Sequence, residues 1–367
     1  MPRSVNEFGL ISKYFTPLTN ACVGALGLTD DAALVSHEPG YEIVVTCDAL
    51  VCGVHFRSED EPEDVAARAL RVNLSDLAAM GSQPVSYLLT LAAPAGITET
   101  WLERFVAQLA LDQETYQLNL IGGDTVITPG PLTLSITALG QIPKGQALTR
   151  SGAKVGDRIF VSGNIGDAGL GLKLLHGELE SLTKAQEIGL KARFLRPEPR
   201  IALGQALIGI VHSVTDVSDG LVADLGHICA LARVGAHLNV SSIPLSTGAR
   251  AAVDMAPDLL PSFLSSGDDY ELVFTAPEAT RDALASIASS TGVMITEIGE
   301  MVKAGAVAIS DDGLPVQNGQ VLRYALEYAQ KYGVPIINHA EDVHLRNYGV
   351  MNESTYSTRL GLPGNPD

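Results

Sequence analysis

Apolar residues with helical spacing and with strand spacing alternate along the 367-residue chain. Residues Glu63–Met80 are apolar almost all the way round a helix, which is typical of a helix buried in a core. Tyr41–Thr46 is rich in β-branched residues and predicts a strand that delivers Asp48 at its end. Within residues 1–148 the pattern also predicts a helix at Glu7–Phe15, a strand at Val85–Leu91, a helix at Thr98–Leu118, and strands at Leu118–Ile121 and Leu132–Ile142.

A second series of elements follows the stretch Thr149–Gly156, which we interpret as a junction between two domains. The strands expected there are Arg158–Ser162, a run into Asp216, Ala236–Val240, Tyr270–Thr275 and Val293–Ile298. The helices expected there are Gly166–His176, Glu187–Phe194, Pro199–Val211, Leu221–Arg233 and Pro277–Ser290. This alternation predicts an α/β (α+β) protein with domains at residues 1–148 and 149–329 and a less patterned extension at 330–367.

Beyond its acidic first turn, the buried helix predicted at Glu63–Met80 contains one further acidic residue, Asp76. Asn73 and Asp76 are three residues apart on one stripe of that helix, so both side chains point the same way. The stripe offers no Lys or Arg, and an ionised carboxylate there costs several kcal/mol unless a cation or hydrogen-bond donors meet it. Two interpretations remain open: Asp76 caps a neighbouring turn, or it faces a divalent metal on which other carboxylates converge.

Composition and charge narrow the classes of partner. The chain is 46% hydrophobic and 18% charged, as in globular proteins, and its formal net charge is −18, which disfavours broad binding to nucleic acids or anionic membranes. No apolar run reaches the length of a membrane span, and the N-terminus lacks the apolar region of a signal peptide. The four cysteines form no CxxC pair, which indicates reduced thiols in a cytoplasmic protein without structural zinc.

Aspartates recur at the ends of predicted strands and beside glycines. A single Asp in such a place is usually a turn residue or a helix cap, but several together are better explained by a shared site. Carboxylates without His or Cys favour Mg²⁺ or Mn²⁺ over zinc, and proteins usually hold Mg²⁺ jointly with substrate phosphates. The aspartates in these settings are Asp30, Asp31, Asp48, Asp124, Asp216 and Asp219, and Asp76 of the buried helix is added to them.

The chain has no Walker A sequence (GxxxxGK[ST]), so a bound nucleotide would depend mostly on metal ions to neutralise its phosphates. Gly163–Gly169 follows a predicted strand and opens a helix, so its N–H groups could cradle an anion or simply form a tight turn. Asp216–Gly220 is a stronger signal, because two carboxylates and a hydroxyl precede a helix. His55 and Arg150 are candidates for substrate and phosphate contacts, although a solvent-exposed side chain is the ordinary expectation for each.

Taken together, several segments resemble bacterial thiamine-monophosphate kinase, whose superfamily includes aminoimidazole-ribonucleotide synthetase and selenophosphate synthetase. The similarity runs roughly from Glu7 to Ile309 and rests on TDDAAL, TCDALVCGVHF, RVNLSDLAAMG, IGGDT, ALTRSGAKVGD, DVSDGLVADLGHI and SGDDYEL. It implies transfer of the γ-phosphoryl group of ATP to thiamine monophosphate, giving thiamine diphosphate. It also implies a homodimer whose N-terminal strands pair across the two-fold axis, with the active site in a cleft between the domains.

The resemblance implies roles for individual residues. Ligands for several Mg²⁺ ions fall on Asp30, Thr46, Cys47 (through its carbonyl), Asp48, Asp76, Asp124, Asp216 and Asp219. Nucleotide-contacting positions fall on Gly123, Asp124, Arg150 and Ser218, and a substrate-contacting position falls on His55. Asp268 stands where the family commonly has the longer Glu, and Tyr324 is the candidate for the aromatic residue that stacks on thiamine, since the single Trp is Trp101.

On this basis we expect direct in-line transfer, with Asp48, Asp76, Asp124 and Asp216 as the catalytic carboxylates. The acceptor phosphate is already ionised at neutral pH and needs no strong base, while clustered Mg²⁺ would reduce the repulsion between two anions. One alternative is another ATP-dependent member of the superfamily, which activates an amide, selenium or carbamoyl group; the N-terminal Cys or Lys motif common there is absent. The other is a non-catalytic Mg²⁺- or Ca²⁺-binding regulatory protein, for which EF-hand spacing is absent.

Overall fold

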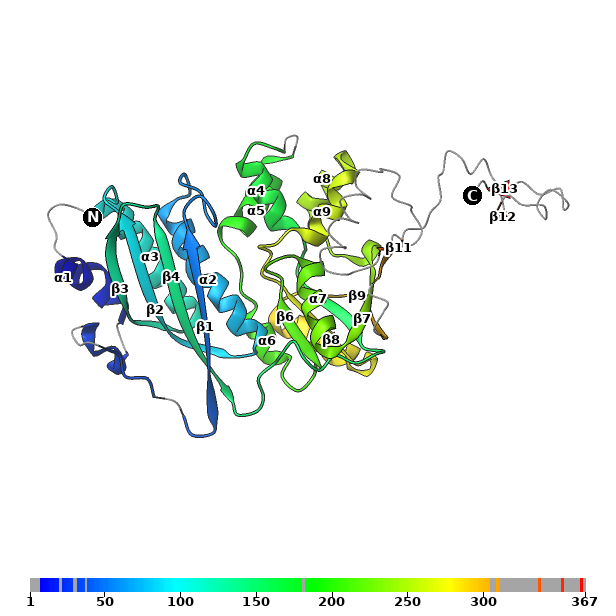
Figure 1. Ribbon diagram of the computed structural model, residues 1–367, viewed down its shortest axis with the longest axis horizontal. Coiled ribbons are helices and arrows are strands. Elements are labelled where there is room, and N and C mark those ends of the chain that lie inside the picture. The colour runs from blue at the N-terminus through cyan, green and yellow to red at the C-terminus, as the bar shows by residue number, and fades with distance from the viewer. Residues whose placement is uncertain are drawn as a thin grey trace.

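The computed structural model describes residues 7–19, 22–28, 32–36, 38–179, 182–303, 308–310, 336–337, 351–352 and 364–365. Two sheets with helices packed on them form two domains side by side (Figure 1). The sheet of the first domain has the strand order β1-β4-β2-β3, and that of the second has the order β11-β10-β7-β9-β5-β8-β6. The α/β (α+β) class and the two-domain architecture expected from the sequence are confirmed.

The strands are β1 (Tyr41–Val51), β2 (Gln83–Pro94), β3 (Asn119–Thr128), β4 (Thr133–Pro143), β5 (Arg158–Ser162), β6 (Ser213–Asp216), β7 (Val234–Asn239), β8 (Leu272–Ala276), β9 (Ile295–Lys303), β10 (Ala308–Ser310), β11 (Ile336–Ile337), β12 (Met351–Asn352) and β13 (Gly364–Asn365). The α-helices are α1 (Glu7–Leu10), α2 (Pro62–Ala79), α3 (Glu99–Tyr116), α4 (Asp167–Leu175), α5 (Lys184–Leu195), α6 (Ile201–Ala206), α7 (Leu221–Ala232), α8 (Thr247–Met255), α9 (Leu260–Ser265) and α10 (Arg281–Thr291). A π-helical turn, Ile11–Phe15, and 3₁₀ turns supplement them at Thr16–Thr19, Val23–Leu28, Val240–Ser242, Pro257–Leu259 and Glu278–Thr280.

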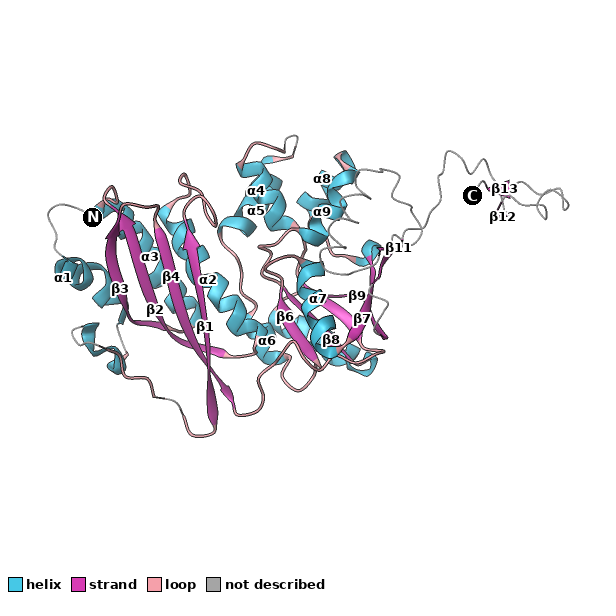
Figure 2. Cartoon of the chain, viewed as in Figure 1, coloured by secondary structure: helices cyan, strands magenta, loops and turns pink. Residues whose placement is uncertain are grey.

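Among the described residues, helices cover the first sheet on one face only. Helices α2 and α3 lie behind strands β1–β4 in Figure 2, and their apolar side chains form one core with the even-numbered residues of β4. The opposite face carries exposed apolar side chains, of which Val45 is 59% and Val126 42% exposed. The sheet is thus packed on one side and open on the other.

Two strands are longer than the sequence pattern predicts, and both include an aspartate that we expected at a strand end. Asp48 lies within β1, paired with Ile136 of β4, and Asp124 lies within β3, paired with Thr90 of β2. The pairing continues because the alternation of inward and outward side chains continues through these acidic residues. The expectation that each aspartate follows its strand is therefore wrong.

Helix α2 belongs to the cores of both domains. Its middle turns pack in the first core, whereas Ala78 in its last turn packs with Leu203 and Phe274 of the second domain. The closest approach is at Gly204 of α6, where an added Cβ would lie 2.0 Å from the carbonyl oxygen of Ala78. Helices α8 and α9 were not expected from the sequence, and part of the expected helix Pro199–Val211 is a turn, so that α6 ends at Ala206.

None of the helices within the described residues is long and apolar enough to cross a membrane.

Candidate active site

Strand β1 and helix α2 present polar side chains to each other across the first core. The Thr46 hydroxyl donates to Oδ2 of Asp76 at 2.5 Å, and the backbone N–H of Asp48 donates to Oδ1 of Asn73 at 3.0 Å. The prediction that Asn73 and Asp76 point the same way is confirmed, because both meet β1. These bonds place the carboxylates of Asp48 and Asp76 next to each other at the edge of the first domain.

The second domain brings a third carboxylate to this place. Asp216, at the end of β6, is 2% exposed and accepts a 2.7 Å hydrogen bond from the hydroxyl of Ser75 on α2. Arg150, in the connection between the domains, donates from Nε to the Thr215 hydroxyl at 3.0 Å, which brings a positive charge to the same end of β6. Asp76 is thus close enough to Asp48 and to Asp216 for its charge to act on both, and we call these three residues the carboxylate cluster.

The pKa values of the carboxylate cluster reflect burial and mutual repulsion. Burial raises the pKa of Asp48, and the charge of Asp76 raises it further. Burial also raises the pKa of Asp76, against the hydrogen bond from Thr46 and the charge of Arg150. The pKa of Asp216 is raised to about 7, first by burial and then by the charge of Asp76. Three carboxylates held together against their repulsion are chemically suited to divalent cations that prefer oxygen ligands.

The segment Asp216–Gly220 continues from the carboxylate cluster to the start of α7. Its backbone N–H groups at Ser218, Asp219 and Gly220 all donate to Oδ2 of Asp224, at 3.0–3.1 Å. Ligand atoms of Asp219, Asp224 and His227 lie within 4.8 Å of one another. The backbone N–H groups at the start of α7, where a phosphate could bind, therefore donate to a carboxylate of the chain itself.

The N–H groups of the glycine-rich loop Gly163–Gly169 are also bonded to a carboxyl group of the chain itself. The carboxylate of Asp269, which is fully buried, accepts from the backbone N–H of Gly166 at 2.7 Å and from that of Ala168 at 3.2 Å. An added Cβ at Gly163 would lie 2.1 Å from Oε1 of Glu271, so the loop is also closely packed. Of the two interpretations given to this loop, an anion cradle and a tight turn, the structure shows a cradle of N–H groups that is filled by a side chain of the same domain.

Two predicted site residues, Asp124 and Gly123, lie away from the carboxylate cluster. Asp124 is exposed on β3, and the strand register Asp124–Thr90–Ser135–Ala49 places it three strands from β1, about 14 Å away at the usual strand spacing. Its partner Thr90 alternates with core residues of β2, so Asp124 faces the open side of the sheet. Within one chain, Asp124 does not join the cluster.

Gly123 precedes Asp124 in β3, whereas Cys47 lies in β1 between Thr46 and Asp48. Gly123 has φ of +152°, and an added Cβ would lie 1.8 Å from the carbonyl oxygen of Leu89, so strand packing alone requires glycine there. The thiol of Cys47 is exposed and lies 3.6 Å from the Ser135 hydroxyl on β4. Asp30, Asp31 and Tyr324, by contrast, lie outside the described residues.

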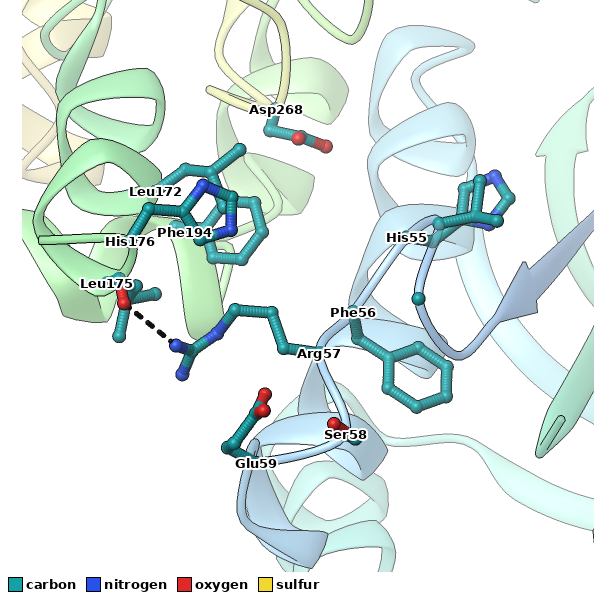
Figure 3. Close-up of a pocket in the computed structure, with 12 residues that line it drawn as sticks. His55, Phe56, Arg57, Ser58, Glu59, Leu172, Leu175, His176, Phe194 and Asp268 are labelled. Carbon is teal, nitrogen blue, oxygen red and sulfur yellow. Dashed lines mark hydrogen bonds between the residues drawn. The ribbon is translucent and has the colours of Figure 1, made fainter. Parts of the chain in front are cut away.

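A pocket of about 470 Å³ is lined by residues of both domains. One wall is the loop Gly53–Glu59 after β1, another is helices α4 and α5 with Leu172, His176 and Phe194, and Asp268 forms the third (Figure 3). The ring of His55 accepts from the backbone N–H of Val51 through Nδ1, at 3.1 Å. The charge of His55 lowers the pKa of Asp48, so the 53–59 wall of the pocket interacts electrostatically with the carboxylate cluster.

Arginines connect the walls of this pocket. Arg57 donates to the carbonyl oxygen of Leu175 at 3.0 Å, which joins the 53–59 loop to the end of α4 (Figure 3). Arg68 of α2, 4% exposed, forms a 2.5 Å ion pair with Asp268. Arg68 is not predicted as a site residue from the sequence. The available signal is the presence of two arginines, Arg68 and Arg71, among the apolar residues in the middle of this helix.

Comparison with known proteins identifies the relatives of this chain. The family model "AIR synthase related protein, N-terminal domain" matches residues 29–142, and "AIR synthase related protein, C-terminal domain" matches residues 154–312. The chain is 41% identical over 305 residues to thiamine-monophosphate kinase of Caulobacter vibrioides, covering 82% of this chain and 86% of that protein. It is also 41% identical over 312 residues to the enzyme of the same name from Escherichia coli K12, covering 84% and 95%.

Solved structures agree with these matches. The crystal structure of thiamine-monophosphate kinase from Stenotrophomonas maltophilia K279a is 42% identical, has a TM-score of 0.74, and aligns over 82% of this chain and 95% of that one. AaThiL complexed with AMPPCP and TMP is 30% identical, with a TM-score of 0.68 over 85% and 95% of the two chains. The hydrogenase maturation protein HypE of E. coli, 20% identical with a TM-score of 0.70 over 83% and 94%, shares the fold.

Proposed function

Because the chain belongs to the AIR synthase related family, and within it to the thiamine-monophosphate kinases, we propose that it transfers the γ-phosphoryl group of ATP to the phosphate of thiamine monophosphate. The products are ADP and thiamine diphosphate, and the chain is a phosphotransferase. The observation that carries this proposal is the carboxylate cluster together with a pocket of ligand size lined by both domains. The anionic substrates and the acidic cluster repel each other, so the site needs cations between them.

Several Mg²⁺ ions are the cations we propose. Asp48, Asp76 and Asp216 would hold them at the cluster, with further ligands at Asp30, Thr46, Asp219 and the carbonyl of Cys47. When bound, Mg²⁺ neutralises phosphate charge and fixes the geometry of both substrates. Thr46, Asn73 and Ser75 have a supporting role, because their hydrogen bonds fix β1, α2 and β6 at one spacing.

ATP would lie with its phosphates at the carboxylate cluster. Arg150 is the cation of this chain placed to contact them, since its charge lowers the pKa of both Asp76 and Asp216. Ser218 is the second nucleotide contact we propose in this chain, through its side chain, because its N–H is bonded to Asp224. Gly123 and Asp124 remain proposed nucleotide contacts from the first sheet.

The pocket between the domains suits the acceptor. Leu172 and Leu175 provide apolar surface for the rings of thiamine, and the carboxylates of Glu59 and Asp268 are placed to attract its cationic thiazolium ring (Figure 3). The phosphate of the acceptor would point past His55 toward Asp48. Tyr324 remains a proposal for stacking on the thiamine rings.

The transfer we propose is direct and in line. A phosphate oxygen of thiamine monophosphate forms a bond to the γ-phosphorus as the bond from that phosphorus to the bridging oxygen of ADP breaks. The acceptor oxygen is already ionised, so no proton has to be removed. Asp48, Asp76 and Asp216 act by positioning charge and not as bases.

A homodimer would account for the place of Asp124. The open face of the first sheet carries Asp124 together with exposed apolar residues such as Val45 and Val126, as expected of a surface that another sheet covers. We propose that N-terminal strands of two copies pair across the two-fold axis, and that Asp124 of each copy faces the carboxylate cluster of the other. Catalysis in the cytoplasm, where ATP is available, is part of the same proposal.

The test is formation of thiamine diphosphate from thiamine monophosphate, ATP and Mg²⁺ by the purified protein. We expect product with thiamine monophosphate, none when Mg²⁺ is omitted, and none from free thiamine as a competing acceptor. Absence of product from the monophosphate, with ATP still bound in the presence of Mg²⁺, would move the function to another branch of the superfamily.

A further inference from the structure

We propose that Arg68 is a positioning residue for the acceptor pocket: it holds the three walls of the pocket at a fixed spacing without touching the acceptor. This rests on the function proposed above for the pocket. Arg68 is 4% exposed and does not line the pocket. Its effect on the reaction must therefore be transmitted through the residues that it binds.

Each donor group of the Arg68 guanidinium binds a different wall. Nε donates to the carbonyl oxygen of His55 in the 53–59 loop at 2.8 Å, and Nη1 donates to the carbonyl oxygen of Phe194 at the end of α5 at 2.7 Å. Nη2 forms the 2.5 Å ion pair with Asp268. The guanidinium also lies over the Phe194 ring, 4.3 Å from its centroid. One side chain thus joins three segments that are far apart in the sequence.

Arg68 adds to other bonds of these segments, such as that of Arg57 to the carbonyl oxygen of Leu175 and that of the Asp268 N–H to the carbonyl oxygen of Ser218 at 2.9 Å. In the loop, Gly53 has a positive φ of +84°, and Val54 is 73% exposed. Asp268 and Tyr270 are non-glycine residues with φ of +70° and +51°, a conformation that L-residues keep only when their surroundings impose it. The ion pair with Arg68 and a 3.2 Å hydrogen bond from the Tyr270 hydroxyl to Asp268 are such restraints.

The Arg68–Asp268 pair also gives a physical role to Asp268. Asp268 lines the pocket, and its Oδ1 is bound to the guanidinium. The second carboxylate oxygen is left for the acceptor, since the side chain is 32% exposed. Arg68 therefore sets both the position and the orientation of a proposed acceptor contact.

The carboxylate cluster is held by other bonds. Thr46 binds Asp76 and Ser75 binds Asp216, and neither pair includes Arg68. Loosening the pocket walls should consequently weaken binding of the acceptor while leaving ATP binding unchanged. That selectivity separates positioning of the pocket from a general effect on stability.

Arg71 supplies the matched control. It lies three residues further along α2 and makes the same kinds of contact: an ion pair with the buried Asp112 at 2.7 Å and a 3.2 Å hydrogen bond to the carbonyl oxygen of Pro197. It is not among the residues that line the pocket. If acceptor binding weakens only because a buried guanidinium has been removed from α2, it should weaken equally in both arginine variants.

The experiment compares Arg68→Lys, Arg71→Lys and the unaltered protein. We expect Arg68→Lys to raise KM for thiamine monophosphate about tenfold, as for one lost charge-assisted hydrogen bond, with KM for ATP unchanged. Arg71→Lys should change neither constant. Asp268→Glu in the Arg68→Lys background should restore part of the loss, because the longer carboxylate reaches the shorter cation. Equal changes in both KM values, or the same change in both arginine variants, would overturn the proposal.

A second measurement does not depend on activity. Amide hydrogen exchange without substrates should become faster in residues 53–59 and 266–270 of Arg68→Lys, and should stay unchanged there in Arg71→Lys. If Arg68→Lys does not fold, Asp268→Asn breaks the same ion pair from its more exposed side and should show the same faster exchange. Unchanged exchange in the folded variant refutes the role of Arg68. An unaltered protein without kinase activity refutes the proposed function instead.

Discussion

The hydroxyl of Ser75 donates a 2.7 Å hydrogen bond to Oδ2 of Asp216, which joins helix α2 of the first domain to strand β6 of the second. Burial raises the pKa of Asp216 to about 7, and this hydrogen bond lowers it. Ser75→Ala should therefore raise the pKa further. Since the bond favours the ionised form by about 1.4 kcal/mol, the acid limb of kcat/KM should move up by about one pH unit at limiting Mg²⁺.

Ser82→Ala is the control for this prediction. Ser82 is also a buried hydroxyl at the end of α2, but it donates to the carbonyl oxygen of Leu77, at 3.1 Å. Ser82→Ala should lower the stability of the protein without moving the acid limb of kcat/KM. Identical acid limbs in the two variants would show that the Ser75 hydrogen bond does not control Asp216.

Asp76→Asn should abolish turnover and at the same time stabilise the metal-free fold. The charge of Asp76 raises the pKa of both Asp48 and Asp216, so removing it relieves repulsion in the carboxylate cluster. We expect the free energy of unfolding, measured with urea in the presence of EDTA, to rise by on the order of 1 kcal/mol. A folded Asp76→Asn protein that still makes thiamine diphosphate would contradict the role of this residue.

The sequence predicts most of this fold because its apolar periodicity is strong where elements are buried. Helix α2 was predicted at Glu63–Met80 and is observed at Pro62–Ala79. Asp76 and Asp216 can be predicted as candidate site residues because a charged side chain within an apolar segment has few explanations. Helix α8, by contrast, is short and surrounded by loops, and its pattern of apolar residues spans too few turns to be distinctive.

The rest of the site depends on contacts that no sequence pattern contains. That Asp269 fills the glycine-rich loop follows from tertiary packing across about a hundred residues. Arg68 looked like one polar interruption of a helix, and its three partners lie in separate segments. Asp124 fits the motif of the family, but the strand order places it on the far edge of the sheet.

If Asp124 faces the cluster of the partner copy, two inactive variants should restore each other. Asp76→Asn and Asp124→Asn are each expected to be inactive as homodimers. A mixed dimer has both substitutions in one site and neither in the other, so random exchange of subunits should recover roughly a quarter of wild-type activity. Activity would be followed after mixing under conditions that allow exchange. No recovery from subunits shown to exchange would place Asp124 outside the partner's site.

The contact between α2 and α6 should be sensitive to a single methyl group. A Cβ at Gly204 would meet the carbonyl oxygen of Ala78 at 2.0 Å, so Gly204→Ala forces the two helices apart and should cost about 1–3 kcal/mol. Gly189→Ala in α5 is the control, because nothing lies within 4 Å of its added Cβ. That change should stabilise the protein by about 0.5–1 kcal/mol through helix propensity. Urea unfolding of both variants tests the pair, and equal effects would contradict the close contact.

Asp269 should make stability fall as pH rises. Burial raises its pKa from 3.8 to about 8, although N–H groups of Gly166 and Ala168 favour the ionised form. Between about pH 4 and 8 the unfolded chain releases this proton first, so stability decreases through that window and levels off above it. The amide of the Asp269→Asn variant does not ionise, so this contribution is absent from the dependence of its stability on pH.

The two stability profiles should therefore converge with rising pH. At pH 5 the Asn variant should be less stable than wild type, because its amide replaces one acceptor oxygen with a donor facing the loop. Toward pH 8 the wild type should lose on the order of 3 kcal/mol that the variant does not lose. Urea unfolding at pH 5, 6.5, 8 and 9 measures the difference, with Asp282→Asn on exposed α10 as control. Parallel profiles for wild type and Asp269→Asn would mean that the loop holds Asp269 ionised throughout, with its N–H groups outweighing the cost of burial.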